Sequence, residues 1–521
     1  MSFIAIMLQD FWENTVLQNK ILILGRIKMK DKHEFSLQRA EESVLKIKDD
    51  VKKAPSRQSY HFMPPAYWMN DPNGVIFFEG KYHLFYQFHP YAPVWGPMHW
   101  GHAISPDLLH WEHLPIALAP SEDYDMDDRG GCFSGSAVYE NGILSLMYTG
   151  AVRIDGEYVQ TQCLAQSNDS VHFEKYEGNP VVEKPEWLQS TDFRDPKVFK
   201  HEKIWYMLVG AKDKDKGKVL LYRSYDLKEW EFFSVLAESR GELGYMWECP
   251  DFFEISGKYV LFISPMGVYD RKTVYLIGDM DFKTGKFNYH SIGEIDWGFD
   301  YYAPQTLLNA SNQRIVLAWA NEWDWMPWFN GFGPTYKDNW CGSLALPRTV
   351  ELIGDSRLRF KPVDQLKDLR TSAKEYEKSL VGPDNCLEIE AGDNIHCELK
   401  INLNLKETTC DIIEIVIRAS EKYETIIRCN LKTSEISFDR DNADGTRKGV
   451  RRCTLLLINK DELMLHIFMD TCSVEIFTDD YMTVLSSNIY PPKDSNSIYI
   501  RAVNGNAAIN IIKTWGLKSV W

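Results

Sequence analysis

One layout recurs five times between residues 60 and 352, and it constrains the fold more than any other feature of the sequence. Each copy has a polar or acidic turn, a short apolar strand, a second turn and another apolar strand. The copies begin at Asp71, Ser134, Asp195, Glu248 and Pro304, so consecutive starts are 63, 61, 53 and 56 residues apart. Short aromatic strands at this spacing are typical of propeller blades with long loops.

A second motif keeps the same phase as the first. The pattern Ser-x-Asp-x-x-x-aromatic occurs at residues 105–111, 167–173 and 224–230, late in three copies, where a hairpin would join the outer strands. The alternative is a two-sheet β-sandwich with chance similarity, but the agreement of two independent motifs favours a propeller. If the first strand of each blade lines the central channel, the residues that open the repeats should meet at one mouth of that channel.

We therefore expect an all-β protein, a five-bladed β-propeller followed by a C-terminal β-sandwich. The propeller should span residues 60–361, because helical periodicity is nearly absent there. Residues 1–59 are expected to form a leader and a helical segment, and residues 362–382 a linker. Residues 383–521 carry short runs that alternate apolar and polar side chains, as half-buried antiparallel strands do.

The composition narrows the classes of partner. The formal net charge is -16, which argues against nucleic acid or an anionic membrane as the main partner. None of the ten cysteines forms a Cys-x-x-Cys pair, so we expect no structural metal site and no cofactor. No apolar core of signal-peptide length follows a basic start, and a cytoplasmic location is expected. The sequence does not indicate an oligomeric state.

Three carboxylates hold a similar phase in three repeats, namely Asp71, Asp195 and Glu248. At one partly buried channel mouth they would repel one another and lose solvent, which should raise the pKa of at least one of them. Two carboxylates of unequal pKa are the requirement of glycoside cleavage, in which one protonates the leaving oxygen and the other attacks or activates water. A Ca²⁺ site and three unrelated turn caps are the alternatives.

Aromatic side chains near these acids favour a sugar over a metal ion. Trp68, Phe133 and Trp247 flank the cluster, and their flat apolar faces suit a sugar ring. Trp323, Trp325 and Trp328 could line an outer subsite or pack in the core. Cys249, next to one of the acids, is expected to be a small buried side chain rather than a nucleophile.

Four segments carry a family resemblance. WMNDPNG at 68–74, FSG at 133–135, FRDP at 193–196 and WECP at 247–250 resemble the signature blocks of glycoside hydrolase family 32, which includes invertases, sucrose-6-phosphate hydrolases, inulinases and levanases. The resemblance runs from about His61 to the C-terminus, and DTCSVEIF at 470–477 is similar to a block of the family's C-terminal sandwich. Residues 1–54 have no counterpart.

The resemblance implies a retaining mechanism through a covalent fructosyl-enzyme intermediate. Asp71 matches the nucleophile, Glu248 the general acid/base, and Asp195 the acid that binds fructose hydroxyls and stabilises the transition state. Substrate contacts are implied for Asn70, Gln87, Trp95, Ser134 and Arg194. We expect hydrogen-bond donors to keep the pKa of Asp71 low, and the carboxyls of a retaining pair to lie about 5–5.5 Å apart.

The expected substrate is a small sugar, either sucrose 6-phosphate or sucrose. The preference for the phosphate rests on overall similarity to cytoplasmic bacterial members, and no phosphate pocket can be located in the sequence. A fructan or fructooligosaccharide hydrolase is the alternative within this class. A carbohydrate-binding propeller without activity is the alternative from another class, and the presence of all three acids argues against it.

Overall fold

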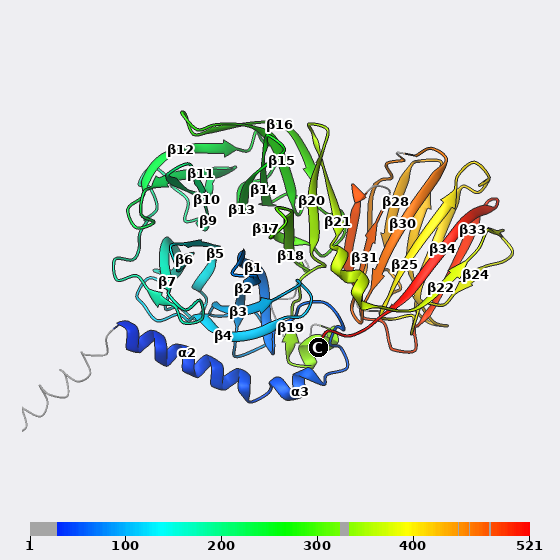
Figure 1. The fold of residues 1–521 in the computed structure, drawn as a ribbon, viewed down its shortest axis with the longest axis horizontal. Helices are drawn as coiled ribbons and strands as arrows, with labels where there is room; N and C mark the ends of the chain where they lie inside the picture. Colours follow the sequence, from blue (N-terminus) through cyan, green and yellow to red (C-terminus); the bar gives the residue numbers. More distant parts are fainter. Residues whose placement is uncertain (1–28, 324–332, 446, 458, 479–480) are drawn as a thin grey trace, which may run out of the picture.

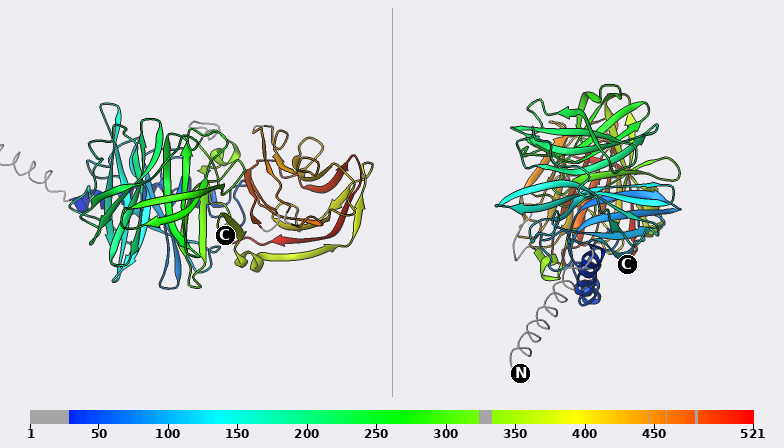
Figure 2. Two further views of the ribbon diagram at one scale, coloured as in Figure 1. Left: turned by 90° about the horizontal axis from the view of Figure 1, so that it is seen from above. Right: turned by 90° about the vertical axis from the view of Figure 1, so that its left-hand side faces the viewer.

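The structure, a computed structural model, describes residues 29–323, 333–445, 447–457, 459–478 and 481–521. It is an all-β protein with two bodies side by side (Figure 1). The sheets of the N-terminal body surround a common centre, and the C-terminal body consists of facing, curved sheets (Figure 2). Residues 1–28 of the expected leader, together with Trp325 and Trp328, lie outside the described residues.

The N-terminal body is built from short strands that pair with their neighbours in sequence. Its described part has one five-stranded and four four-stranded sheets. In chain order these contain β1 (Tyr67–Phe78), β2 (Lys81–His89), β3 (His99–Ser105) and β4 (Glu112–Leu118); β5 (Gly131–Glu140), β6 (Ile143–Ile154), β7 (Glu157–Ser167) and β8 (Glu174–Lys175); β9 (Phe193–His201), β10 (Ile204–Asp213), β11 (Lys216–Ser224) and β12 (Glu231–Glu238); β13 (Met246–Ile255), β14 (Lys258–Met266), β15 (Val274–Asp281) and β16 (Lys286–Glu294); β17 (Tyr302–Leu308), β18 (Arg314–Trp319), β20 (Arg348–Ile353) and β21 (Arg357–Pro362).

The first strands of these sheets form a ring. β1 contacts β5, β5 contacts β9, β9 contacts β13, β13 contacts β17, and β17 returns to β1. The two-residue strand β19 (Trp340–Cys341) joins the first sheet and pairs in parallel with the start of β1, with Tyr67 opposite Trp340. A strand from late in the chain therefore completes the sheet that begins with the earliest strand.

The C-terminal body has two antiparallel sheets with an apolar core between them. One contains β22 (Arg370–Tyr376), β34 (Ala507–Leu517), β25 (Cys397–Asn404), β30 (Glu462–Met469), β31 (Ser473–Phe477) and β32 (Val484–Asn488), with β23 (Ser379–Val381) beside β34. The other contains β24 (Leu387–Ile389), β33 (Ser497–Val503), β26 (Ile412–Ala419), β27 (Thr425–Asn430), β28 (Glu435–Asp439) and β29 (Val450–Thr454).

The segment expected to be a linker, residues 362–382, is mostly ordered in strands. It begins with the short helix η1 (Asp364–Leu369) and continues as β22 and β23, which both pair with β34. The sequence of β22 gives no sign of a half-buried strand, because most of its side chains are exposed. The first sheet of the C-terminal body thus starts at Arg370.

Two helices before the first strand cover an edge of the N-terminal body. The helix α2 (Met29–Leu45) contacts β4 and leads into α3 (Lys48–Lys52). The backbone N–H of Ile116 donates to the Glu41 carboxylate at 2.5 Å, and that of Ala119 donates to Nε2 of His33 at 3.1 Å. The helix therefore takes up N–H groups of an edge strand that would otherwise be open to another chain. A further short helix, α4 (Gly333–Lys337), precedes β19.

A buried ionic network joins the two bodies. Arg348 on β20 donates to Asp296 at 2.9 Å and to Glu475 on β31 at 2.8 Å. His61 lies 2.8 Å from Asp470 and 3.2 Å from Glu475. Burial lowers the pKa of His61, but its hydrogen bonds with the two carboxylates outweigh burial and raise the pKa to about 9. Pairing of each charge with an opposite one makes these buried groups tolerable.

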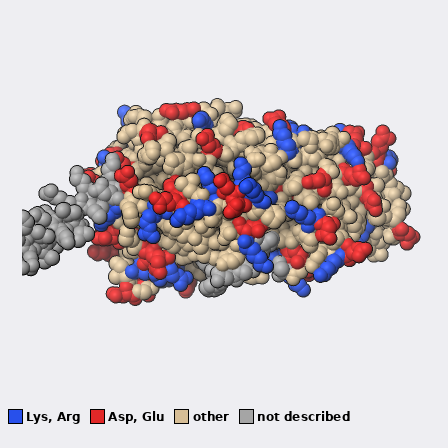
Figure 3. Space-filling view, turned by 90° about the horizontal axis from the view of Figure 1, so that it is seen from below, with Lys and Arg blue, Asp and Glu red and all other residues tan. Residues whose placement is uncertain are grey.

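Charges of both signs are mixed on the face shown in Figure 3, and the cysteines are unpaired. Lys and Arg side chains are interspersed with Asp and Glu on the face in Figure 3. All ten cysteines are free, and nine of them are buried. Within the described ranges, no helix has the length and apolar character needed to cross a membrane. The same ranges contain no group of three His, Cys, Asp or Glu side chains arranged to hold a metal ion.

Candidate active site

The acid-bearing turns of the sequence are β-bulges in the structure. In β1, β9, β13 and β17 the pairing register skips two residues, which include Asp71, Asp195, Cys249 and Ala303. In β5 the register skips at Ser134. A bulge bends the strand and re-aims a side chain. The prolines at or beside four of these bulges fit because proline cannot donate a ladder hydrogen bond.

A pocket of about 300 Å³ lies at the ends of these strands. Nine of the ten residues expected in the site line it: Asn70, Asp71, Gln87, Trp95, Phe133, Ser134, Arg194, Asp195 and Glu248. The tenth, Trp68, does not line the pocket. Its side chain is buried against Trp319 and Trp323, and its indole N–H donates to Oδ1 of Asn70 at 2.8 Å. Trp68 thus holds a pocket residue in place from behind.

Asp71 is almost fully buried at the floor of the pocket, with 7% of its surface exposed. Its Oδ2 accepts hydrogen bonds from the Ser134 hydroxyl at 2.7 Å and from the Cys249 thiol at 3.5 Å. Its Oδ1 has no hydrogen-bond partner within the described residues. One carboxylate oxygen is thereby anchored while the other is left open.

The pKa of Asp71 is raised to about 6, so the expectation of a low pKa was wrong. Burial is the largest cause, and the negative charge of Glu248 adds to it. The hydrogen bond from Ser134 opposes this rise without cancelling it. Desolvation of the charged form thus outweighs the few donors that reach it.

Asp195 lies beside Asp71 and shares one neighbour with it. Its Oδ2 accepts the Cys249 backbone N–H at 2.9 Å and the Cys249 thiol at 3.5 Å. Burial raises the pKa of Asp195 to about 7, although the positive charge of Arg194 opposes the rise. The Cys249 thiol is 3% exposed and burial raises its pKa well above the usual value, which agrees with a small buried side chain. The thiol acts as a donor between two carboxylates.

Glu248 is fixed through both of its oxygens. Arg194 donates to Oε1 from Nε at 3.0 Å and from Nη2 at 2.8 Å, and the Tyr302 hydroxyl donates to Oε2. The same guanidinium donates to Asp192 at 2.7 Å. Two hydrogen bonds from one guanidinium restrict both the position and the orientation of the Glu248 carboxyl. The side chain of Glu248 is 14% exposed, so it also faces the pocket opening.

An aromatic wall rises on one side of the pocket. The ring centroids of Trp95 and Phe133 are 6.2 Å apart, and those of Phe133 and Tyr158 are 6.1 Å apart. All three side chains are half-buried and line the pocket, as does Trp323. Buried acids at the floor and aromatic faces along the side suit a sugar that enters with one ring first.

Comparisons with known proteins agree with this arrangement. Residues 61–362 match the glycosyl hydrolases family 32 N-terminal domain, and residues 365–516 match the glycosyl hydrolases family 32 C-terminal domain. The chain belongs to glycosyl hydrolase family 32. A sucrose-6-phosphate hydrolase of Zymomonas mobilis is 37% identical over 511 residues, which cover 91% of this chain and 96% of the relative.

Solved structures of family 32 enzymes share the fold. The Bombyx mori GH32 beta-fructofuranosidase BmSUC1 has a TM-score of 0.79 at 35% identity, covering 94% of this chain and 99% of that one. A mutant of that enzyme was solved in complex with sucrose. The sucrose-6-phosphate hydrolase of Lactobacillus gasseri has a TM-score of 0.81 at 28% identity, covering 92% of this chain and 97% of that one.

Some residues that line the pocket of this family 32 protein were not predicted from its sequence. Gln160 and Tyr158 lie on β7, which belongs to no acid-bearing turn, and Met266 ends β14. Asp192 directly precedes the FRDP block at 193–196, and this position could have identified it as a pocket residue. Tyr302 stands two positions before Pro304 in the fifth repeat, as Glu248 stands two positions before Pro250 in the fourth. Its phase was visible, but a tyrosine did not suggest a contact to a catalytic acid.

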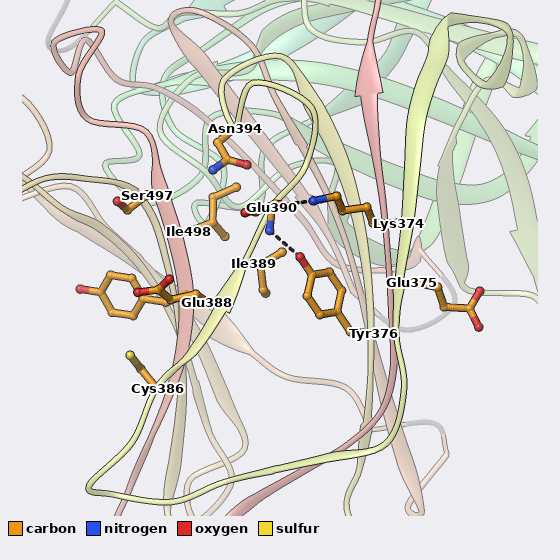
Figure 4. Close-up of a pocket in the computed structure, with 11 residues that line it drawn as sticks. Lys374, Glu375, Tyr376, Cys386, Glu388, Ile389, Glu390, Asn394, Ser497 and Ile498 are labelled. Carbon is orange, nitrogen blue, oxygen red and sulfur yellow. Dashed lines mark hydrogen bonds and ion pairs between the residues drawn. The ribbon is translucent and has the colours of Figure 1, made fainter.

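A second, larger groove lies in the C-terminal body, with a volume of about 720 Å³ (Figure 4). Several of its polar groups are paired with one another: Lys374 pairs with Glu390, and the hydroxyl of Tyr376 accepts the backbone N–H of Glu390 at 2.7 Å. Both members of the ion pair are at least half exposed. The smaller pocket, with its buried carboxylates, is therefore the candidate active site of this family 32 protein.

Proposed function

We propose that this protein is a retaining β-fructofuranosidase of the sucrose-6-phosphate hydrolase type. It cleaves the fructosyl bond of sucrose 6-phosphate, and of sucrose, through a covalent fructosyl-enzyme intermediate. The observation that carries this proposal is the buried, unpartnered Oδ1 of Asp71 in a pocket shared with Glu248. Family membership and the substrate named for the Zymomonas and Lactobacillus relatives support it.

In the first step, Oδ1 of Asp71 attacks C2 of the fructosyl unit. The bond from C2 to the glycosidic oxygen breaks, and Glu248 gives its proton to that oxygen, so glucose 6-phosphate or glucose leaves. In the second step, Glu248 takes a proton from water, which attacks C2 and releases fructose from Asp71. Asp195 accepts hydrogen bonds from fructose hydroxyls and stabilises the positive charge of the transition state.

The surroundings of each acid support its proposed role. With a pKa of about 6, Asp71 is mostly ionised at neutral pH and remains a stronger nucleophile than an ordinary carboxylate. Arg194 and Tyr302 hold Glu248 still, so the same carboxyl can act first as acid and then as base. The Trp95, Phe133 and Tyr158 wall gives the sugar an apolar face to pack against.

We also propose that residues 60–361 form a five-bladed propeller. The ring of contacts from β1 through β5, β9, β13 and β17 back to β1 supports this arrangement. In it, the first strand of each blade lines the channel and brings its bulged residue to one mouth. A cytoplasmic location stays a prediction from the sequence.

The direct test replaces each proposed catalytic acid by its amide. Asp71→Asn should abolish release of fructose, and Glu248→Gln should lower kcat by about 10²–10⁴-fold. With a Glu248→Ala variant, azide should intercept the fructosyl-enzyme and yield fructosyl azide, because azide needs no general base. Asp107→Asn, on the exposed Ser-x-Asp turn after β3, is the control and should leave kcat unchanged. Unchanged hydrolysis in either active-site variant would reject the assignment.

The substrate is tested by comparing kcat/KM on sucrose 6-phosphate, sucrose and inulin. We expect kcat/KM to be highest on sucrose 6-phosphate. A relative named levanase is 33% identical over 504 residues, so the fructan alternative stays in the comparison. A higher value on inulin would replace our assignment with a fructan hydrolase, and binding without turnover would favour the carbohydrate-binding alternative.

A further inference from the structure

Arg129 stands at the rim of the active-site pocket on a firmly seated loop. Its side chain lines the pocket and is exposed to solvent. Its backbone N–H donates to the Asp127 carboxylate at 2.7 Å, and its carbonyl accepts the Tyr158 hydroxyl. The next residue, Gly130, has no room for a side chain, because a Cβ there would lie 2.1 Å from the Ala151 carbonyl oxygen. The loop therefore presents Arg129 from a fixed backbone.

Among the described residues, the positive charge of Arg129 has no acidic partner. Its acidic neighbours Asp127 and Asp128 both pair with Arg153. The other pocket arginine, Arg194, pairs with Asp192 and Glu248. The guanidinium of Arg129 makes no ion pair or hydrogen bond to any described residue. It lies near Tyr158, where its positive charge opposes the rise that burial causes in the pKa of that phenol. It is a cation available to a ligand.

The layout of the pocket fixes which part of a substrate would reach Arg129. The attacking Asp71 is at the floor, so the fructosyl unit must enter first and the leaving group must lie toward the rim. The Trp95, Phe133 and Tyr158 wall leads in that direction and ends at the loop that carries Arg129. A leaving glucosyl unit packed on this wall would carry its 6-substituent at the rim.

We propose that Arg129 binds the phosphate of the glucosyl 6-phosphate group and determines the preference for sucrose 6-phosphate over sucrose. The inference rests on the function proposed above. The planar guanidinium can donate two parallel hydrogen bonds to a phosphate. The pocket otherwise presents the carboxylates of Asp71, Asp192, Asp195 and Glu248 against the single charge of Arg194. A phosphate dianion needs a compensating cation at its own end of such a site.

The test compares two substrates in the full-length enzyme. We expect Arg129→Gln to lower kcat/KM on sucrose 6-phosphate by about 10- to 100-fold, the usual loss for a charge-assisted hydrogen bond. On sucrose, kcat/KM should change less than about twofold. Arg223→Gln is the matched control: it removes the same charge from an arginine that pairs with Glu231 across β11 and β12, and both substrates should react as with wild type.

Two further measurements separate a phosphate contact from a structural role. Glucose 6-phosphate should inhibit sucrose hydrolysis by wild type more strongly than by Arg129→Gln, whereas inhibition by glucose should be equal. Arg129→Lys, which keeps the charge but loses the fork, should fall between wild type and Arg129→Gln on sucrose 6-phosphate.

Each remaining outcome refutes some part of the reasoning. Equal losses on both substrates, or no loss on sucrose 6-phosphate, would overturn the role of Arg129 while leaving the enzyme a fructofuranosidase. A wild-type enzyme that cleaves neither substrate would reject the proposed function, and the role of Arg129 with it.

Discussion

The hydrogen bond from Ser134 to Asp71 gives a quantitative test of the nucleophile. The hydroxyl donates to Oδ2 at 2.7 Å, and its effect opposes burial. A hydrogen bond to a charged group contributes about 1.5–3 kcal/mol, and 1.36 kcal/mol corresponds to one pKa unit. Removing it in Ser134→Ala should therefore raise the pKa of Asp71 from about 6 by about one to two units.

The assay is the pH profile of kcat/KM, whose acid limb reports the free enzyme's essential base. Because only ionised Asp71 can attack, Ser134→Ala should lose about 5- to 50-fold at pH 6 through ionisation alone and recover most of that loss above pH 8. Asp71 and Asp195 interact, so the limb reports the pair, but its direction of movement is fixed.

Ser136 supplies a control on the same strand. Its buried hydroxyl donates to the Pro196 carbonyl at 2.8 Å and accepts the Val198 N–H at 2.9 Å, and neither partner is ionisable. Ser136→Ala should lower stability by about 1–3 kcal/mol without moving the acid limb. An acid limb that stays in place in Ser134→Ala, or that moves equally in both variants, would refute the argument for Asp71 as the ionised group.

Other variants test separate parts of the structure. Asp71→Asn should be more stable than wild type above pH 6 by up to about 3 kcal/mol. The reason is that the pKa of the buried acid is raised, so its ionisation destabilises the wild-type fold as pH rises from about 4 to 6. Urea unfolding of the two proteins should differ above pH 6 and agree at pH 4. Tyr302→Phe removes a donor from Glu248 and should lower kcat about tenfold with KM little changed, which steady-state kinetics on sucrose measure. In wild type, the raised pKa of His61 contributes stability that is fully present below pH 6.5 and is lost as pH rises through about 9. His61→Gln should remove this pH dependence of the free energy of unfolding, which urea unfolding at low and at high pH measures.

The repeat could be predicted because four of the five bulges leave a local mark in the sequence. An acidic or small residue beside a proline, followed by an apolar strand, can be recognised without any long-range information. The two-residue strand β19 has no such mark, since Trp340 and Cys341 have too few neighbours to show alternation. The family match to residues 61–362 and 365–516 confirms the family recognised from the four blocks.

Within the site, sequence reasoning identified side chains better than their surroundings. Trp68 was expected to contact a sugar because it flanks the acid cluster, but position in a motif does not tell which side chain faces the pocket when a bulge follows. The low pKa expected for Asp71 failed because the number of donors and the degree of burial are tertiary properties. Arg129 was missed for the same reason, since only the structure shows that Arg153 takes both of its acidic neighbours.

The pairing at the start of β1 sets the order in which the site can be assembled during synthesis. β1 leaves the ribosome before every other described strand, yet it pairs with Trp340 and Cys341, and the segment just before it is held by Asp470. Domains usually fold as the chain emerges. Here the segment before β1 can be held by Asp470 only after about 400 further residues have been added. The segment that leads into β1 therefore gains these contacts only near the end of translation.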